Sequence, residues 1–258
     1  MGDGIYTALT GAIAQEHSLD VLANNVANST TTGFRGDRVV FGQLLAGAQK
    51  QENVDPRQRP PPVTDKFVRV EEHALDSRPG PLESTGNVLD FALNGEGFFV
   101  IRTPNGDRLT RAGRFMLKDL GDLNTMLTTV DGSPVLDENA DPIVFPRGTK
   151  EIVVNNDGFV RADNVEIAQL AVRRVLNPVE DLVREGTTTY APAEGAQLVR
   201  PIDIDVRQAH LEASNINAMA GLNELITVNR SFDALQRVIQ TFQQMDQRTA
   251  RDIGSRNG

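Results

Sequence analysis

The sequence predicts an α+β fold in which helices at the two chain ends pair into a coiled-coil-like domain, with an all-β domain inserted between them. Near both ends, apolar residues recur at steps of three and four, which is the helical period. The middle of the chain instead has short apolar or alternating runs separated by Asn-Gly and Asp-Gly dipeptides. These patterns divide the 258 residues into a helical domain (1–35 with 211–258), an extended connector (36–87) and a β domain (88–210).

The N-terminal helix is predicted by a heptad-like stripe of apolar and small residues, interrupted once by Glu16. Its members are Ile5, Leu9, Ala12, Leu19, Ala23 and Val26. We expect the helix to end near Asn28, because the short polar side chains of residues 29–32 compete for backbone hydrogen bonds. Gly33 then permits a sharp change of direction.

The C-terminal helix is predicted from about Asn217 to Asp252, with Ser214 and Asn215 as caps at its start. Its stripe consists of Leu225, Val228, Phe232, Leu235, Ile239 and Phe242. An isolated helix of this kind is marginal in water, so we expect the two helices to pack together. Their remaining apolar surface is then available to neighbouring copies. The alternative is that both helices simply cover one face of the β domain.

The middle of the chain is expected to hold short strands. Residues 50–66 are rich in Gln, Pro and charged residues, which is typical of an extended linker. Hairpin turns are predicted at Asn105-Gly106, Asp131-Gly132 and Asp157-Gly158. Strands are predicted at 98–101, 151–154, 165–175 and 202–206. In the last of these, alternation predicts that Ile202, Ile204 and Val206 are buried and that Asp203 and Asp205 face solvent.

Composition excludes several classes of function. The chain has 26 Lys and Arg against 35 Asp and Glu, and this net charge of −9 argues against a broad nucleic-acid surface. The absence of Cys excludes disulfides, thiolate metal sites and a cysteine nucleophile. The charge is uneven: residues 1–35 carry three acidic residues and one basic residue, and residues 210–258 carry five of each. Most of the negative charge therefore belongs to residues 36–209.

No targeting or membrane segment is expected. Residues 1–20 contain no Lys or Arg and no long apolar stretch, so a cleaved signal peptide is not predicted. The longest clear apolar run, residues 97–101, is far below the ~20 residues that span a bilayer. We therefore expect no membrane insertion and, if the chain leaves the cytoplasm, export by another route.

No catalytic, cofactor or metal site is predicted. His17, His73 and His210 form no helical two-histidine pair, and no stretch completes an EF-hand or a glycine-rich phosphate loop. Asp203 and Asp205 could form a carboxylate pair, but a solvated strand face is the favoured interpretation. A structural or interaction protein without a small-molecule substrate is therefore favoured. A carbohydrate hydrolase and a soluble β-domain binding module remain as alternatives.

Two motifs resemble those of the bacterial flagellar rod and hook proteins. The N-terminal positions that match are Ala23, Asn24, Asn25, Ala27, Asn28, Thr31, Gly33 and Phe34. Residues at the entry to the C-terminal helix also match, namely Leu211, Glu212, Ser214, Asn215 and Asn217. Residues 88–100 and 109–115 resemble the central core of the same family. These blocks stand in the family order and span nearly the whole chain.

The resemblance implies a structural subunit of the flagellar basal-body rod, whose terminal helices stack into a torque-transmitting axial tube. The implied partners are other copies of the chain, neighbouring rod proteins and the flagellar type III export apparatus, and no cofactor is implied. The implied location is the periplasmic rod, reached without a cleaved signal peptide. The length is compatible with a proximal-rod or a distal-rod subunit, and residues 4–9 and 234–240 resemble the proximal-rod subunit more. A distal-rod subunit is the main alternative, and another hook or rod axial protein is a less favoured one.

Overall fold

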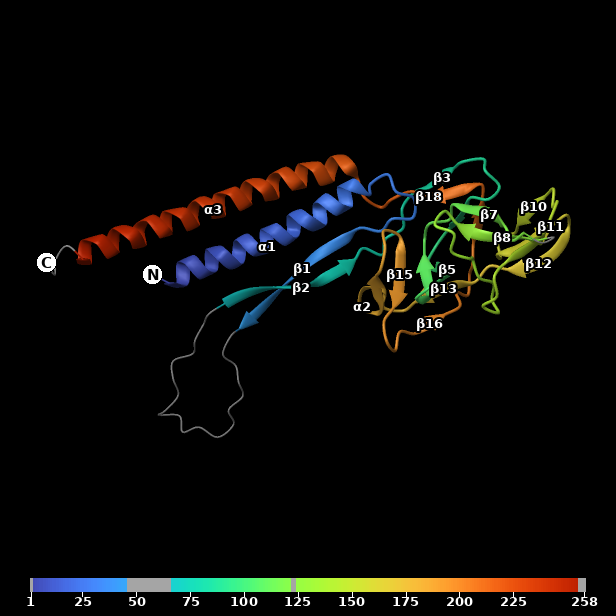
Figure 1. Ribbon diagram of the computed structural model, residues 1–258, viewed down its shortest axis with the longest axis horizontal. Coiled ribbons are helices and arrows are strands. Elements are labelled where there is room, and N and C mark those ends of the chain that lie inside the picture. Colours follow the sequence, from blue (N-terminus) through green and yellow to red (C-terminus); the bar gives the residue numbers. More distant parts are fainter. Residues whose placement is uncertain (1, 46–65, 122–123, 255–258) are drawn as a thin grey trace, which may run out of the picture. The chain divides into compact units, whose positions relative to one another are not determined.

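The computed structural model describes residues 2–45, 66–121 and 124–254. It has a helix at each end and a β-rich middle, which confirms the predicted α+β class (Figure 1). The chain forms two compact units, and each is described by itself. The helical unit comprises residues 1–26, 38–74 and 218–258, and the β unit comprises residues 27–37 and 75–217. Residues 46–65, most of the predicted linker, lie outside the described residues.

The helical unit contains two long helices and a pair of strands. Helix α1 is Gly2–Ala27 and ends close to the predicted Asn28, and helix α3 is Ala218–Gly254, close to its predicted bounds. Strands β1 (Asp37–Leu45) and β2 (Lys66–Leu75) form a two-stranded sheet. The range 36–87, predicted as an extended connector, thus contains these strands and also β3 of the β unit.

Helices α1 and α3 approach closely where one of them has a glycine. The close pairs are Gly4 with Phe242, Gly11 with Leu235, and Gly221 with Val26. A Cβ atom added to these glycines would lie 3.0, 3.5 and 2.7 Å, respectively, from the partner side chain. The residue numbers of the contact positions increase along α1 (4, 11, 26) while those of their partners decrease along α3 (242, 235, 221). The two helices therefore run antiparallel.

The β unit is built from short strands and one short helix, α2 (Pro178–Asp181). Its strands are β3 (Leu82–Ser84), β4 (Phe91–Leu93), β5 (Phe98–Thr103), β6 (Gly106–Thr110), β7 (Phe115–Asp119), β8 (Asn124–Thr129), β9 (Val144–Pro146), β10 (Ile152–Val154), β11 (Phe159–Ala162), β12 (Val165–Gln169), β13 (Val172–Val175), β14 (Leu182–Arg184), β15 (Thr189–Pro192), β16 (Leu198–Val199), β17 (Val206–Gln208) and β18 (His210–Glu212). The largest sheet has the order β14-β15-β6-β5-β13-β16. The remaining sheets are β10-β11-β12, β7-β8-β9, β17-β4 and β18-β3.

The three predicted turns are confirmed. Gly106 closes the hairpin between β5 and β6, and Gly158 lies in the turn between β10 and β11. Gly132 lies in the turn that follows β8, where its N–H donates to the carbonyl of Thr129. All three glycines have positive φ values, at 108°, 81° and 83° respectively. The dipeptides therefore supply the left-handed backbone that tight turns need.

The predicted strand at 202–206 is largely wrong. Only Val206 belongs to a strand, β17, where it pairs with Leu93. Val206 is buried as expected, but Ile204 is only half-buried and Ile202 is 99% exposed. Pro201 has no N–H to donate, and β17 pairs with β4 only from Val206 onward. Without a partner strand, the alternating sequence does not produce alternating burial.

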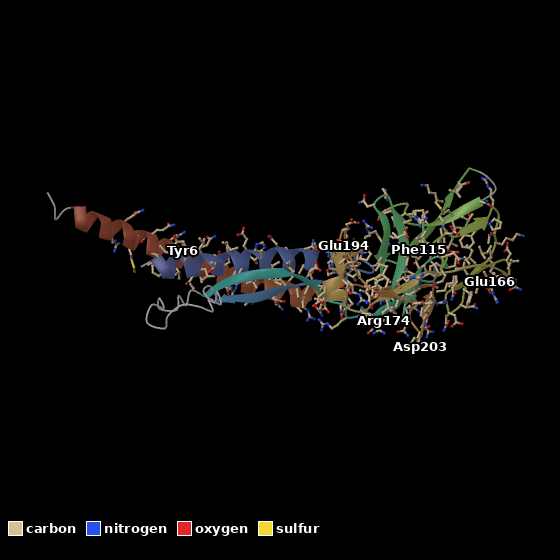
Figure 2. The ribbon with its side chains drawn as sticks, turned by 90° about the horizontal axis from the view of Figure 1, so that it is seen from below. Tyr6, Phe115, Glu166, Arg174, Glu194 and Asp203 are labelled. Atoms are coloured by element: carbon tan, nitrogen blue, oxygen red, sulfur yellow. The ribbon has the colours of Figure 1, made fainter. Side chains whose placement is uncertain are left out.

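Two apolar clusters hold the β unit together. In the larger cluster, the ring of Phe115 lies 5.4 Å from that of Phe99 and 5.8 Å from that of Phe91, measured between centroids (Phe115 is labelled in Figure 2). The smaller cluster includes Phe98 and Tyr190, whose rings lie 5.7 Å apart at a steep angle. Such aromatic contacts add to the stabilisation from apolar burial.

Candidate functional site

The segment that follows α1 turns at the residues of the N-terminal motif. The N–H of Thr31 donates to the carbonyl of Asn28 over 3.1 Å, and the Thr31 hydroxyl donates to the Asn28 side-chain oxygen over 3.2 Å. The helix therefore ends next to the predicted Asn28, and a backbone turn with one bond between side chains follows it. The N–H of Phe34 then donates to the carbonyl of Thr31 over 3.2 Å, which continues the turn.

Gly33 lies at a point of very close backbone approach. Its φ is +71°, and an added Cβ would lie 2.3 Å from the backbone nitrogen of Ala112. Its N–H donates to the carbonyl of Glu212 over 2.7 Å. Any larger residue would require the backbone to move, so this position requires glycine.

Asn215 joins three parts of the chain. Its side-chain oxygen accepts from the N–H of Gly36 over 2.9 Å, and its amide donates to the carbonyls of Asp76 (3.0 Å) and Arg78 (3.1 Å). The prediction that Ser214 and Asn215 cap α3 is wrong, because α3 begins only at Ala218. We call residues 33–37, 75–80, 111 and 211–215 the junction.

A buried charged cluster lies within the junction. The carboxylate of Glu212 accepts from Arg35 Nη2 over 2.7 Å and from Arg111 Nη1 over 2.8 Å. It also accepts from the N–H of Gly80 over 3.0 Å. Arg35, Arg111 and Glu212 are each at most 3% exposed. One carboxylate therefore pairs with two buried guanidinium groups, so the three side chains together carry one net positive charge.

Backbone carbonyls satisfy further donors of these arginines. Arg111 donates to Leu93 O over 3.2 Å and to Gly95 O over 2.6 Å, and its guanidinium carbon lies 5.3 Å from the centre of the Phe98 ring. Arg35 donates to the carbonyl of Ser77. Burial lowers the pKa of Arg111 to about 10, although the nearby Glu212 carboxylate acts in the opposite direction. Desolvation thus opposes the charged form, and the ion pairs retain it.

Arg184 extends the network to the apolar core. It donates twice to the carboxylate of Asp37, each time over 2.9 Å. Its guanidinium carbon lies 4.9 Å from the Phe34 ring centre and 5.1 Å from that of Tyr190. Burial raises the pKa of the Tyr190 hydroxyl, while the charge of Arg184 lowers it. Cation–π contacts of this kind are strongest when desolvated.

Arg35, Arg111 and Arg184 were not predicted from the sequence as site residues. Arg111 lies inside the family-like block 109–115, and Arg35 directly follows the motif residue Phe34. Arg184 lies between Val183 and Glu185, where nothing in the local sequence distinguishes it from a surface arginine. Glu212 was identified as a motif residue, but its partners lie 177 and 101 positions away in the sequence.

The predicted stripe on α3 coincides with its pattern of burial. Between Ala218 and Met245 the half-buried positions are Ala218, Gly221, Leu225, Val228, Phe232, Leu235, Ile239 and Phe242. Every other side chain in this stretch is exposed. The helix therefore has one apolar stripe that is only partly covered within a single chain.

The predicted stripe on α1 is covered less evenly. Ala12 is buried, Ile5, Leu19 and Val26 are half-buried, and Leu9 and Ala23 are exposed. Gly4, Gly11 and Val26 lie against α3, opposite Phe242, Leu235 and Gly221 respectively. Gly4 and Gly11 are not members of the predicted stripe, so the α1 face that meets α3 includes residues outside that stripe.

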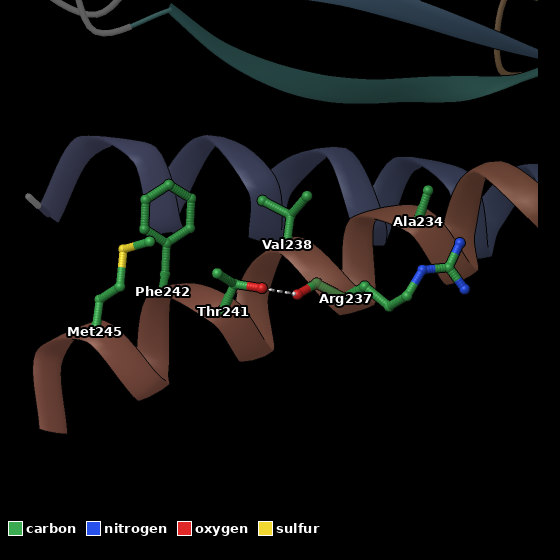
Figure 3. A pocket seen from close by; sticks show the side chains of 6 residues that line it. All are labelled: Ala234, Arg237, Val238, Thr241, Phe242 and Met245. Carbon is green, nitrogen blue, oxygen red and sulfur yellow. Dashed lines mark hydrogen bonds between the residues drawn. The ribbon is translucent and has the colours of Figure 1, made fainter. Parts of the chain in front are cut away.

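Large apolar side chains are also exposed on both helices. They are Tyr6, Leu9 and Ile13 on α1, and Met219, Leu222, Ile226, Val238 and Met245 on α3. A shallow hollow on α3 is lined by Ala234, Arg237, Val238, Thr241, Phe242 and Met245 (Figure 3). Clusters of exposed apolar side chains on a protein surface are typical of interaction sites.

The residues considered for catalysis do not converge. Asp205 accepts from Asn94 and Arg207, whereas Asp203 is exposed beside the fully exposed Ile202. His17 is exposed on α1, and His210 lies in β18. Among the described residues, no group of three or more His, Asp or Glu could hold a metal ion. Nor does any helix in the described ranges have the length and apolarity to cross a membrane.

Three family models match this chain. Residues 5–35 match "Flagella basal body rod protein", residues 92–162 match "Flagellar hook protein FlgE/F/G D1 domain", and residues 207–252 match "Flagellar basal body rod FlgEFG protein C-terminal". The first and last matches include the two motifs that meet at the junction.

Curated relatives agree with these matches over nearly the full length. The flagellar basal-body rod protein FlgF of Rhizobium meliloti is 36% identical, over 90% of each chain. FlgF of Mesorhizobium japonicum is 30% identical over 100% of both chains. The rod protein FlgG of Agrobacterium fabrum is 31% identical over 92% of this chain and 94% of its own. This chain therefore belongs to the family of flagellar basal-body rod proteins.

Proposed function

We propose that this protein is a structural subunit of the flagellar basal-body rod, most similar to the proximal-rod protein FlgF. Its terminal helices assemble with other copies and with neighbouring rod proteins into the axial tube that transmits torque. The proposal involves no catalysis and no cofactor. It is supported by family membership and by one observation in particular, the half-covered apolar stripe along α3.

The exposure of α3 is the main argument for assembly. No side chain between Ala218 and Met245 is fully buried within the single chain, although Leu, Val, Ile and Phe form a regular stripe there. A long helix gains most of its stability from burying such a stripe. Contacts with α1 supply part of this burial. Neighbouring subunits would supply the rest, through a head-to-tail contact that need not close into a ring.

The contacts between α1 and α3 support a coiled-coil-like pairing. Gly4 and Gly11 are one heptad apart, and so are their partners Phe242 and Leu235. A contact that repeats every seven residues on both helices is typical of side chains that pack as knobs into holes. The near-neutral C-terminal region, with five acidic and five basic residues, favours close packing between like subunits.

Substitutions within the α3 stripe test the proposal. Phe232→Asp and Ile239→Asp place a charge on the stripe, and we expect each to abolish rod assembly and motility in cells that lack the natural gene. Gln236→Asp and Gln240→Asp are the matched controls, since they introduce the same side chain at exposed positions of the same helix. The β unit should remain folded in all four variants. Normal motility of the stripe variants would refute the proposal.

Removal of residues 1–30 tests the contribution of α1. The truncated chain lacks the helix that contacts α3, so we expect it to be absent from purified basal bodies. Incorporation at the level of the full chain would contradict the proposed role of α1.

The chain incorporated into basal bodies should also retain its N-terminal residues, because the flagellar type III apparatus is proposed to export it into the periplasm without cleavage. Mass spectrometry of purified basal bodies measures this directly.

A distal-rod role is the second candidate, because FlgG of Agrobacterium fabrum is also 31% identical. A density map of an assembled basal body containing this chain distinguishes the two roles. A position at the proximal end of the rod supports the main proposal, and a position at the distal end supports the alternative. Complementation of strains lacking one or the other rod protein provides an independent comparison.

A further inference from the structure

We propose that Glu212, Arg35 and Arg111 form a folding interlock. In this view, the β unit completes its fold only when the segment 211–215 has docked on the segment 33–37. Residues 33–37, which follow α1, and residues 211–215, which precede α3, then become ordered in the same cooperative step. This inference concerns the β unit alone and does not depend on how the protein assembles.

Charge balance is the first argument. Arg35 and Arg111 are almost completely buried, and Glu212 is the acidic partner of both, at 2.7 and 2.8 Å. Removal of one partner from a buried ion pair leaves an uncompensated charge, which is strongly destabilising. Without Glu212, the unit would have to bury two like charges next to each other. A β unit that lacks its last segment therefore cannot close around these arginines.

Chain topology is the second argument. The segment 33–37 continues from α1 into β1, the segment 75–80 follows β2, and the segment 211–215 leads to α3. Backbone bonds link these segments: Gly33 N–H donates to Glu212 O over 2.7 Å, and Asp76 N–H donates to Gly36 O over 2.8 Å. The unit is therefore entered and left through segments that contact one another, although they are far apart in sequence.

The third argument is that the cluster is attached to the body of the β unit. Arg111 follows β6 directly and donates to the carbonyls of Leu93 and Gly95, which lie at the end of β4 and in the loop before β5. Its guanidinium also contacts Phe98 of the smaller apolar cluster. Loss of the cluster should therefore affect the central strands as well as the chain ends.

Amide hydrogen exchange of the full chain tests the interlock. In Glu212→Gln, which preserves the size of the side chain and removes its charge, we expect exchange to accelerate at least about a hundredfold. The increase should extend to the β5–β6 hairpin and match that at the junction, because interlocked segments open together. Glu185→Gln is the matched control, since Glu185 pairs with Arg108 at the surface of the same unit. It should leave exchange nearly unchanged.

A rescue variant distinguishes charge imbalance from a loss of packing. Adding Arg111→Met to Glu212→Gln removes one of the two uncompensated cations. We expect exchange in the β5–β6 hairpin to slow again by at least about tenfold. If Glu212→Gln does not fold, recovery of folded protein in the double variant gives the same information. A double variant that is no better than Glu212→Gln would overturn the proposal.

The pattern of exchange provides the second decisive outcome. If Glu212→Gln accelerates exchange only at residues 33–36, 80 and 210–215, the C-terminal segment detaches without opening the strands. The cluster would then stabilise only the segments that it contacts directly, and the interlock would be refuted.

Discussion

Replacement of Gly33 by alanine tests whether the turn after α1 controls the stability of the β unit. Gly33 has a φ of +71°, and a left-handed conformation costs a non-glycine residue about 1–2 kcal/mol. The added Cβ would lie 2.3 Å from Ala112 N and 2.4 Å from the carbonyl carbon of Arg111. Both are backbone atoms, so no side-chain rotation can relieve the contact.

The expected loss follows from what must move. Cβ atoms essentially never approach within 3.0 Å of a heavy atom outside their own residue and its chain neighbours. The backbone at Gly33 must therefore move away from that at Ala112 by about 0.7 Å. That shift weakens the buried bond from Gly33 N–H to Glu212 O, and leaving these groups unpaired costs about 1–3 kcal/mol. Together with the left-handed backbone, we expect Gly33→Ala to lower the free energy of unfolding by about 2–5 kcal/mol.

The matched control is Gly86→Ala. Gly86 has a similar φ of +75°, but no atom of the described residues lies within 4 Å of an added Cβ. The left-handed backbone is then the cost that remains, so we expect Gly86→Ala to lower the free energy of unfolding by about 1–2 kcal/mol. Urea unfolding measures both variants in a Tyr6→Phe background, where near-ultraviolet circular dichroism reports on Tyr190 of the β unit. Equal losses for the two variants would refute the argument from close approach.

Three further predictions concern the β unit. Phe115→Ala should lower the free energy of unfolding by about 3–5 kcal/mol, because the ring is buried between two other aromatic rings. Met116→Ala should lower it far less, because Met116 lies on the same strand but is exposed. Urea unfolding of the two variants compares these losses. Ala209→Gly should raise the unfolding free energy by about 1 kcal/mol, since Ala209 has a φ of +59°, and an unchanged or lower urea midpoint would contradict this. Because burial raises the folded-state pKa of Tyr190 above its unfolded value near 10, the unfolded state loses its proton first and stability should fall as pH rises past that value. Ultraviolet titration in a Tyr6→Phe background should show delayed ionisation of Tyr190, and ionisation in the ordinary tyrosine range would contradict the prediction.

Features of the sequence that depend on near neighbours were predicted well. The C-terminal end of α1 and the period of the α3 stripe follow from side chains within a few positions of one another. The three turns follow from dipeptides that need a left-handed backbone. Each of these features is decided by local sterics and hydrogen bonding, so a single sequence contains the necessary information.

Features that depend on a distant partner were not predicted. Ile202 lies in an alternating pattern, yet no strand pairs with it and the side chain is fully exposed. Asn215 was expected to cap a helix, but its side chain instead binds Gly36, Asp76 and Arg78. In both cases the local sequence favours the predicted role, which is a strand position for Ile202 and a helix cap for Asn215. The tertiary structure determines which groups each residue can contact.

The sequence by itself determined two apolar-striped helices around a β-rich middle and, through its motifs, the flagellar rod family. Only the tertiary structure decided that Arg35, Arg111 and Glu212 meet in one buried cluster. The physical reason is that burial of a charge depends on partners that the fold brings together, here across 101 and 177 positions of sequence. A local pattern can indicate which residues prefer a helix or a turn, but it carries no record of such distant contacts.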